Sequence, residues 1–234
     1  MMIANSSARI PVDALVFDAY GTLFDVQSVI TLAERLFPGK GAALSQLWRT
    51  KQLEYSWLQS LMISPTQRRE DFAALTAHAL DYAAEALSLA PSAAARHRLL
   101  DAYLDLAPFP DVVPALAALG PMPRLILSNG TRQMLELLAA STGVASHLDG
   151  ILSVDAAGIY KPSPRVYQLA VDRLECAPAQ IGFVSSNAWD VVGAKAFGMT
   201  AIWVSRAGAP LERHGPRPDA IIASLAELPA LIGR

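Results

Sequence analysis

An aspartate follows directly on a short apolar run near the N-terminus. Residues 14–17, Ala-Leu-Val-Phe, are suited to a buried strand, and Asp18 then opens the turn sequence Asp-Ala-Tyr-Gly-Thr. In open α/β folds, ligands bind at the carboxyl edge of the parallel sheet, where this carboxylate would stand. Asp18 is therefore a candidate functional group, although an aspartate that only caps a turn would give the same pattern.

Two further stretches carry polar groups after a predicted strand. Residues 124–130 end with Ser128 and Asn129 ahead of a predicted helix, whose first N–H groups suit an anion such as a carboxylate. Lys161 is expected just after the strand at 150–155, ahead of a helix that a proline begins. Both stretches should therefore bring polar groups to the same sheet edge as the first aspartate.

A fourth predicted strand, 181–187, ends in Ser185 and Asn187, and Asp190 stands on the first turn of the next helix. Each of the four stretches has an ordinary structural explanation, such as a helix cap, a solvated lysine or an acidic residue at a helix N-terminus. Together, and all at strand ends, they favour one functional site at the carboxyl edge of a parallel sheet.

Composition limits the classes of function. The chain has 234 residues, 53% of them hydrophobic, and a formal net charge of −2, which suits one large domain or a core with an insertion and offers no basic surface for nucleic acid. No apolar run approaches the roughly 18 residues of a membrane span, and no secretory signal is expected. The single cysteine, Cys176, excludes an internal disulfide, so a cytoplasmic location is expected.

The order of elements predicts an α/β fold. After residue 124, apolar runs at 124–130, 150–155, 181–187 and 200–205 alternate with helical segments near 131–141, 163–174 and 189–197. This alternation is typical of βαβ units and a parallel sheet, and the C-terminal residues read as a final strand and helix. We therefore expect a Rossmann-like parallel-sheet core.

The block from 28 to 107 reads as helices only and predicts an inserted all-helical cap over the sheet edge. Ser64-Pro65 followed by Gln67 resembles a helix start, so a helix is expected to begin there. The preceding helix is apolar on two faces, as if covered by the core and by a second subunit. The predicted domains are a catalytic core, 10–27 with 108–234, and a cap domain, 28–107.

These stretches resemble a known family. "FDAYGT", "LSNG", "YKP" and "SSNAWD", in this order, are similar to the haloacid dehalogenase superfamily, and specifically to its L-2-haloacid dehalogenase branch. The resemblance extends over nearly the whole chain, including the cap segment "LWRTKQLEYSWLQSLM". It implies a Rossmann-like core, a helical cap and a homodimer that acts on small haloacids, without nucleic-acid or membrane partners.

Two departures separate the chain from the metal-dependent phosphatases of that superfamily. Those enzymes carry an aspartate two residues after the nucleophile, where this chain has Tyr20, and a further acidic pair where it has "SSNAWD". Halide leaves without a proton, and a monoanionic haloacid needs no cation to screen its charge. No metal and no cofactor are therefore expected, and a Mg²⁺-dependent small-molecule phosphatase is the less favoured alternative.

The resemblance implies a two-step hydrolysis of L-2-haloalkanoic acids to D-2-hydroxy acids. Asp18 would displace halide from C2 with inversion and form an ester, which water then cleaves at the Asp18 carbonyl carbon. Lys161 and Thr22 would hold Asp18 ionised and oriented, and Arg49 with Asn129 would take the halide. The base for the hydrolytic water stays open between Lys161 and Asp190.

The remaining roles follow from the same resemblance. Ser128 and nearby N–H groups would bind the substrate carboxylate, Asn187 with Asp190 would position the water, and Ser185 with Tyr167 would support them. The apolar pocket positions are Tyr20, Leu53, Phe72 and Trp189.

The cap side departs from the family pattern in two places. The segment before Phe72 is longer than expected, and Thr50 stands where a glutamine is expected. Both bear on chain-length preference, and a fluoroacetate dehalogenase with the same catalytic residues is the nearest alternative. A non-catalytic protein on this fold would be expected to lack some of the catalytic residues, and none is missing from the set Asp18, Arg49, Lys161, Asn187 and Asp190.

Overall fold

The computed structural model describes residues 9–62, 64, 66 and 68–233. Within them, six strands form one parallel sheet in the order β3-β2-β1-β4-β5-β6. This order confirms the α/β class and the Rossmann-like topology. The strands are β1 (Ala14–Phe17), β2 (Arg124–Ser128), β3 (Gly150–Ser153), β4 (Ile181–Ser185), β5 (Thr200–Val204) and β6 (Ala220–Ile222).

The centre of the sheet is β1, whose four side chains are all fully buried. A strand covered on both faces needs a continuous apolar run, and Ala-Leu-Val-Phe supplies one. From β1 the chain adds β2 and β3 on one side and then returns to add β4, β5 and β6 on the other. The strand order therefore reverses between β1 and β4, and the carboxyl ends of these strands are the expected ligand position in such a sheet.

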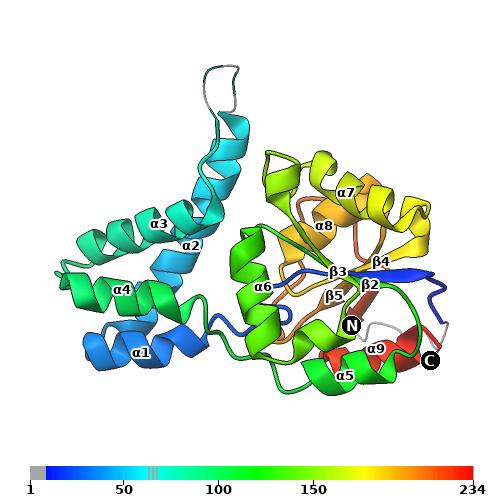
Figure 1. Cartoon of the computed structure of the whole chain (residues 1–234), viewed down its shortest axis with the longest axis horizontal. Coiled ribbons are helices and arrows are strands. Elements are labelled where there is room, and N and C mark those ends of the chain that lie inside the picture. The colour runs from blue at the N-terminus through cyan, green and yellow to red at the C-terminus, as the bar shows by residue number, and fades with distance from the viewer. Residues whose placement is uncertain (1–8, 63, 65, 67, 234) are drawn as a thin grey trace.

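Helices cover both faces of the sheet. Helices α7 and α8 lie over one face, and α5 and α9 lie over the other (Figure 1). The predicted helices at 131–141, 163–174 and 189–197 are confirmed to within about a residue; Thr131 caps the first by accepting from the Met134 N–H, and Pro164 begins the second. Their bounds are α5 (Val112–Ala118), α6 (Arg132–Ser141), α7 (Pro164–Leu174), α8 (Ala188–Phe197) and α9 (Leu228–Leu231).

Four helices between β1 and β2 stand together to one side of the sheet (Figure 1). They are α1 (Ser28–Leu36), α2 (Gly41–Leu61), α3 (Phe72–Ala86) and α4 (Ala93–Ala102). Trp48 of α2 joins three of these segments, since its indole N–H donates to the Thr76 carbonyl on α3 at 2.7 Å and its ring packs 4.6 Å from that of Tyr103, just after α4. Across the described part of the chain, no helix combines the length and apolarity that crossing a membrane requires.

The predicted helix start at Ser64 is wrong. Pro65 and Gln67 lie outside the described residues, but Thr66 and residues 68–71, where that helix would run, are not helical, and α3 begins at Phe72. The cap is Asp71, which has extended backbone and accepts a hydrogen bond from the Ala74 N–H at 2.8 Å. Aspartate is as strong an N-cap as serine, so the sequence contained two competing start signals and the second one is used.

Candidate active site

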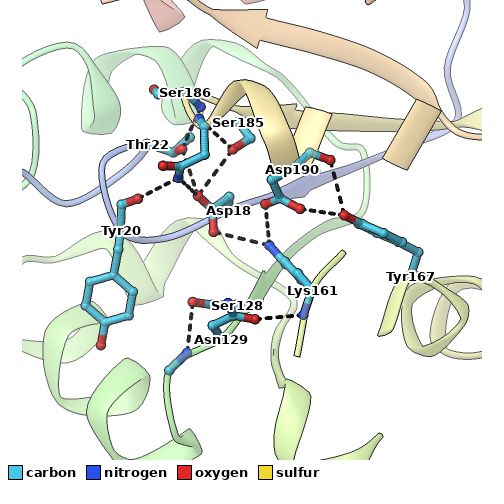
Figure 2. Close-up of polar contacts among 12 residues, drawn as sticks. Asp18, Tyr20, Thr22, Ser128, Asn129, Lys161, Tyr167, Ser185, Ser186 and Asp190 are labelled. Atoms are coloured by element: carbon cyan, nitrogen blue, oxygen red, sulfur yellow. Dashed lines mark hydrogen bonds and ion pairs between the residues drawn. The ribbon is translucent and has the colours of Figure 1, made fainter. Parts of the chain in front are cut away.

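The Asp18 carboxylate is the centre of a hydrogen-bond network at the carboxyl ends of β1 and β4 (Figure 2). Its Oδ2 accepts from the Thr22 hydroxyl at 3.2 Å, the Ser185 hydroxyl at 3.2 Å and the Asn187 amide at 2.7 Å. Its Oδ1 accepts from the Lys161 ammonium at 3.2 Å. Among the described residues, three donors thus hold one carboxylate oxygen, whereas the other oxygen has a single partner.

The turn after β1 places Thr22 and is hydrogen-bonded to the end of β4. Gly21 has a φ of 83°, a left-handed conformation that a residue with a Cβ adopts only under strain, and this reverses the chain directly after Asp18. The Thr22 hydroxyl, one residue later, accepts from the Ser186 N–H at 2.8 Å, and the Asn187 amide donates to the Tyr20 carbonyl at 3.0 Å. The ends of β1 and β4 are therefore tied together around the carboxylate.

Lys161 reaches the site by a longer route than expected. The sequence placed it just after a strand, but β3 ends at Ser153, and a 3-10 turn, η2 (Val154–Ala156), and a further loop come first. The Lys161 N–H then donates to the Asn129 side-chain oxygen at 3.0 Å, which fixes this loop against the end of β2. The expectation of a strand-end lysine is thus wrong in detail, although the side chain does reach the predicted edge.

Lys161 lies between two carboxylates in the interior. Its ammonium contacts Asp18 at 3.2 Å and Asp190 Oδ2 at 2.7 Å, and all three side chains are buried (Figure 2). Burial by itself lowers the pKa of Lys161, but the two carboxylates outweigh this effect and hold the pKa above its ordinary value. The lysine is therefore a fixed cation beside Asp18.

The carboxyl group of Asp190 has a raised pKa. Burial raises its pKa from 3.8 to about 6, while Lys161 and the hydroxyl of Tyr167, which donates to Oδ1 at 2.7 Å, oppose that rise. Burial, followed by the Asp190 charge, raises the pKa of Tyr167 well above 10, so its hydroxyl keeps its proton. Asp190 is thus a carboxylate whose basicity suits proton transfer near neutral pH.

The turn after β2 forms the opposite wall. The Ser128 hydroxyl oxygen accepts from the Gly130 N–H at 3.2 Å, which leaves its own proton available to an anion. Because the Asn129 side-chain oxygen is occupied by the Lys161 N–H, the amide NH₂ of Asn129 is the end left for a ligand. The Ser153 hydroxyl secures the turn by donating to the Gly130 carbonyl at 2.7 Å.

The helical side contributes one cation and a set of apolar side chains. Arg49 lies on α2, Leu53 stands one turn later on the same helix, and the Tyr20 and Phe72 rings pack 5.6 Å apart. Burial raises the pKa of the Tyr20 phenol, and the positive charge of Arg49 opposes that rise. Arg49 itself donates from Nη1 to the Gln52 side-chain oxygen at 2.7 Å.

Trp189 faces a different neighbour. Its ring makes an edge contact with Trp57 of α2, with centroids 5.4 Å apart. Both rings line a largely apolar cavity of about 920 Å³ that lies between the end of α2, the segment 159–164 and helix α8, and that adjoins the site at Lys161. Of the four predicted pocket positions, Tyr20 and Phe72 therefore pack against each other. Trp189 instead lies at the boundary of this cavity.

Sequence reasoning missed the contacts that hold the Lys161 loop against the helices. The Tyr160 hydroxyl donates to the Glu70 carbonyl at 2.7 Å, and the Arg69 guanidinium lies 4.4 Å from the Tyr160 ring centre. Arg69 also pairs with Asp155 of η2 at 2.6 Å. The position of Tyr160 directly before Lys161 was the only available signal, because its partners are about 90 residues away in the chain.

The fold and the site together define a class of protein. A buried aspartate stands at the reversal point of a parallel sheet, with a lysine and three polar donors on its carboxylate, and this is the arrangement of a hydrolase built around an aspartate nucleophile. Comparison with known proteins makes the assignment specific. The chain belongs to the haloacid dehalogenase-like hydrolases, whose family model matches residues 12–198.

Individual relatives resemble the chain over nearly its whole length. It is 41% identical to the (S)-2-haloacid dehalogenase of Xanthobacter autotrophicus, over 94% of this chain and 95% of the relative. It is 42% identical to haloacetate dehalogenase H-2 of a Moraxella species, over 89% and 92%. The solved L-2-haloacid dehalogenase of X. autotrophicus with covalently bound chloropropionic acid superposes with a TM-score of 0.86 at 40% identity, over 95% of this chain and 98% of that one.

Proposed function

We propose that the protein hydrolyses short-chain L-2-haloalkanoic acids to D-2-hydroxy acids, through an Asp18 ester and without a metal. The observation that carries the proposal is the buried Asp18 carboxylate, with three donors on one oxygen and Lys161 on the other. Tyr20 stands where a phosphatase of this fold would need its general acid. The relatives named (S)-2-haloacid dehalogenase, and the chloropropionic acid bound covalently in one of them, support the same reaction.

In the first step, Asp18 Oδ1 attacks C2 of the substrate. An O–C bond forms as the carbon–halogen bond breaks, the halide leaves with the bonding electron pair, and the configuration at C2 inverts. Arg49 offers N–H donors and a charge that is never lost, and the free NH₂ of Asn129 adds another donor, so we assign the halide to these two residues. Ser128 and the N–H groups before α6 bind the substrate carboxylate.

In the second step, water attacks the carbonyl carbon of the Asp18 ester. Negative charge develops on Oδ2, where Thr22, Ser185 and Asn187 already donate, so these residues act as an oxyanion hole. The bond between Cγ and Oδ1 then breaks, and the hydroxy acid leaves with that oxygen, which takes up the proton that the attacking water gave to Asp190. We assign the water proton to Asp190, because its pKa of about 6 suits a base at neutral pH.

The helices α1 to α4 form the cap domain of this proposal, 28–107, over a core made of 10–27 and 108–234. The cap supplies Arg49, Leu53 and Phe72, and the core supplies the nucleophile and both carboxyl-edge turns. The alkyl chain of the substrate packs on Tyr20, Leu53, Phe72 and Trp189. Substrate therefore binds between the two domains.

The test is halide and hydroxy-acid release from L- and D-2-chloropropionate by the purified protein in EDTA. Release of D-lactate from the L-isomer alone supports the proposal, and Asp18→Asn should lower the rate to background. A single turnover in ¹⁸O-water should place the label in the Asp18 carboxylate rather than in lactate. Hydrolysis of p-nitrophenyl phosphate on addition of Mg²⁺, with no haloacid turnover, would refute the proposal.

A second candidate substrate is a haloacetate. The Moraxella relative is named a haloacetate dehalogenase and is as similar to this chain as the 2-haloacid enzymes are. The same residues would act on chloroacetate or fluoroacetate, with no stereocentre to invert. Fluoride release from fluoroacetate, measured beside chloride release from L-2-chloropropionate, distinguishes the two substrates.

We also propose that the protein is a homodimer. Leu61 is 83% exposed and Met62 is 59% exposed at the end of α2, on the helix that the sequence predicts to be covered twice. Light scattering on the purified protein tests the assembly. The single cysteine, Cys176, suits a reducing compartment such as the cytoplasm, which we propose as the location.

A further inference from the structure

A continuous chain of hydrogen bonds within the helical cap ends at the Arg49 guanidinium. Arg49 Nη1 donates to Gln52 Oε1 at 2.7 Å, Gln52 Nε2 donates to Thr76 Oγ1 at 2.6 Å, and Thr76 Oγ1 donates to the Phe72 carbonyl at 2.6 Å. Gln52 is fully buried and Thr76 is 3% exposed. This series of hydrogen bonds therefore connects α2 to α3 through two buried side chains.

These hydrogen bonds fix which end of the Gln52 amide faces Arg49. Thr76 Oγ1 gives its only proton to the Phe72 carbonyl, so toward Gln52 it can only accept. The NH₂ of Gln52 must then point to Thr76, and its oxygen must point to Arg49. A buried amide pinned at one end in this way is a rigid acceptor for the guanidinium at the other.

The acceptor on Arg49 is also uncharged. Arg49 makes no ion pair within the described residues. A glutamate at position 52 would hold the guanidinium equally well but would neutralise it. An amide orients the group and leaves its positive charge for an anion in the site.

We propose that Gln52, pinned by Thr76, is a positioning residue for dehalogenation that holds the Arg49 guanidinium in the orientation in which it receives the departing halide. This inference rests on the proposed function. A catalytic group misplaced by about 1 Å can reduce the rate on the order of 100-fold. Loss of the hydrogen bonds from Gln52 should therefore affect kcat more than KM.

The first test compares Gln52→Leu with the wild type on L-2-chloropropionate and L-2-bromopropionate. We expect kcat on the chloro substrate to fall by about 10- to 100-fold. Chloride is the poorer leaving group and depends more on Arg49, so the bromide-to-chloride ratio of kcat should rise. Inhibition by added bromide should weaken as well. An unchanged ratio together with unchanged bromide inhibition would overturn the inference.

Gln52→Glu separates orientation from charge. This variant keeps an acceptor for Arg49 and adds a negative charge beside it, so bromide inhibition should weaken at neutral pH. Thr76→Val provides a second route if Gln52→Leu does not fold, because it removes the pin and leaves Gln52 in place. It should change the leaving-group ratio in the same direction by a smaller factor.

Trp48→Phe is the matched structural control. It removes the hydrogen bond from the indole to the Thr76 carbonyl, at the same contact between α2 and α3, without touching the route to Arg49. We expect a lower melting temperature with an unchanged bromide-to-chloride ratio. A ratio that shifts as much as in Gln52→Leu would overturn the inference, since general loosening of the cap would then explain both. If the wild type releases no halide, the proposed function itself is wrong.

Discussion

Tyr167→Phe should move the acid limb of the pH–rate profile to higher pH. The variant removes the hydroxyl that donates to Asp190 Oδ1 at 2.7 Å and keeps the ring, which packs 5.6 Å from that of Phe183. The Tyr167 hydroxyl stabilises the ionised form of Asp190 more than the protonated form, and the variant loses this stabilisation. Its pKa, which burial already raises to about 6, must therefore rise further.

The size of the shift follows from the strength of that hydrogen bond. A bond to a charged group contributes about 1.5–3 kcal/mol, and about 1.4 kcal/mol corresponds to one pKa unit. The acid limb should therefore move up by about 1–2 units. A base must be deprotonated to act, so the wild type should lose activity below about pH 6, and the variant should begin to lose it near neutrality.

The assay is the rate of halide release between pH 5 and pH 10 at saturating L-2-chloropropionate. Tyr160→Phe is the control, because it also deletes a buried phenol hydroxyl, but one that donates to the Glu70 carbonyl. The acid limb of its pH–rate profile should stay in place. The same profile tests the identity of the base. Because the pKa of Lys161 is held above 10.5, a rate that keeps rising up to pH 10 and is unaffected by Tyr167→Phe would refute the assignment to Asp190.

Two further substitutions test the charges and the apolar boundary of the site. Lys161→Met leaves Asp18 and Asp190 buried without their shared cation, which should cost about 3–5 kcal/mol and lower the melting temperature by about 10 °C. Both carboxyl groups would then bind protons more tightly in the folded state, so the loss should be larger at pH 8 than at pH 5; equal losses would contradict the argument. Trp189→Ala should open the substrate pocket toward the cavity of about 920 Å³ and raise kcat/KM for 2-bromohexanoate relative to 2-chloropropionate, measured by halide release; an unchanged preference would show that Trp189 is not the boundary.

Local patterns predicted the strands and the edge at which the site forms. The run from Ala14 to Phe17 has the bounds of β1, and Asp190 stands on the first turn of α8, as expected. Both features follow from residues adjacent in the chain, an apolar run ended by a turn or a helix start. The rule that parallel strands end at one edge of the sheet was then enough to predict that these residues form one site.

Features that depend on tertiary contacts were not predictable in this way. The path to Lys161 runs through a 3-10 turn that has no periodic signature, so its distance from β3 was misjudged. Gln52 was one turn from Arg49 and could have been noticed, but Thr76, which determines its orientation, is 24 residues away on another helix. Roles assigned from the resemblance, such as that of Tyr167, acquired a physical reason only from the contacts.

The two cations of the site are held in different ways, and the proposed reaction explains the difference. As halide leaves, negative charge moves from Asp18 to the departing atom, so the site needs one cation beside the nucleophile and another beside the leaving group. Lys161 is fixed between two carboxylates, which keep it protonated and near Asp18. Arg49 cannot lose its proton, so its guanidinium needs only to be oriented, and the neutral amide of Gln52 does this by accepting a hydrogen bond from it. A carboxylate in that place would compete with the halide, and this predicts that bromide inhibits Gln52→Glu less than it inhibits the wild type at pH 8.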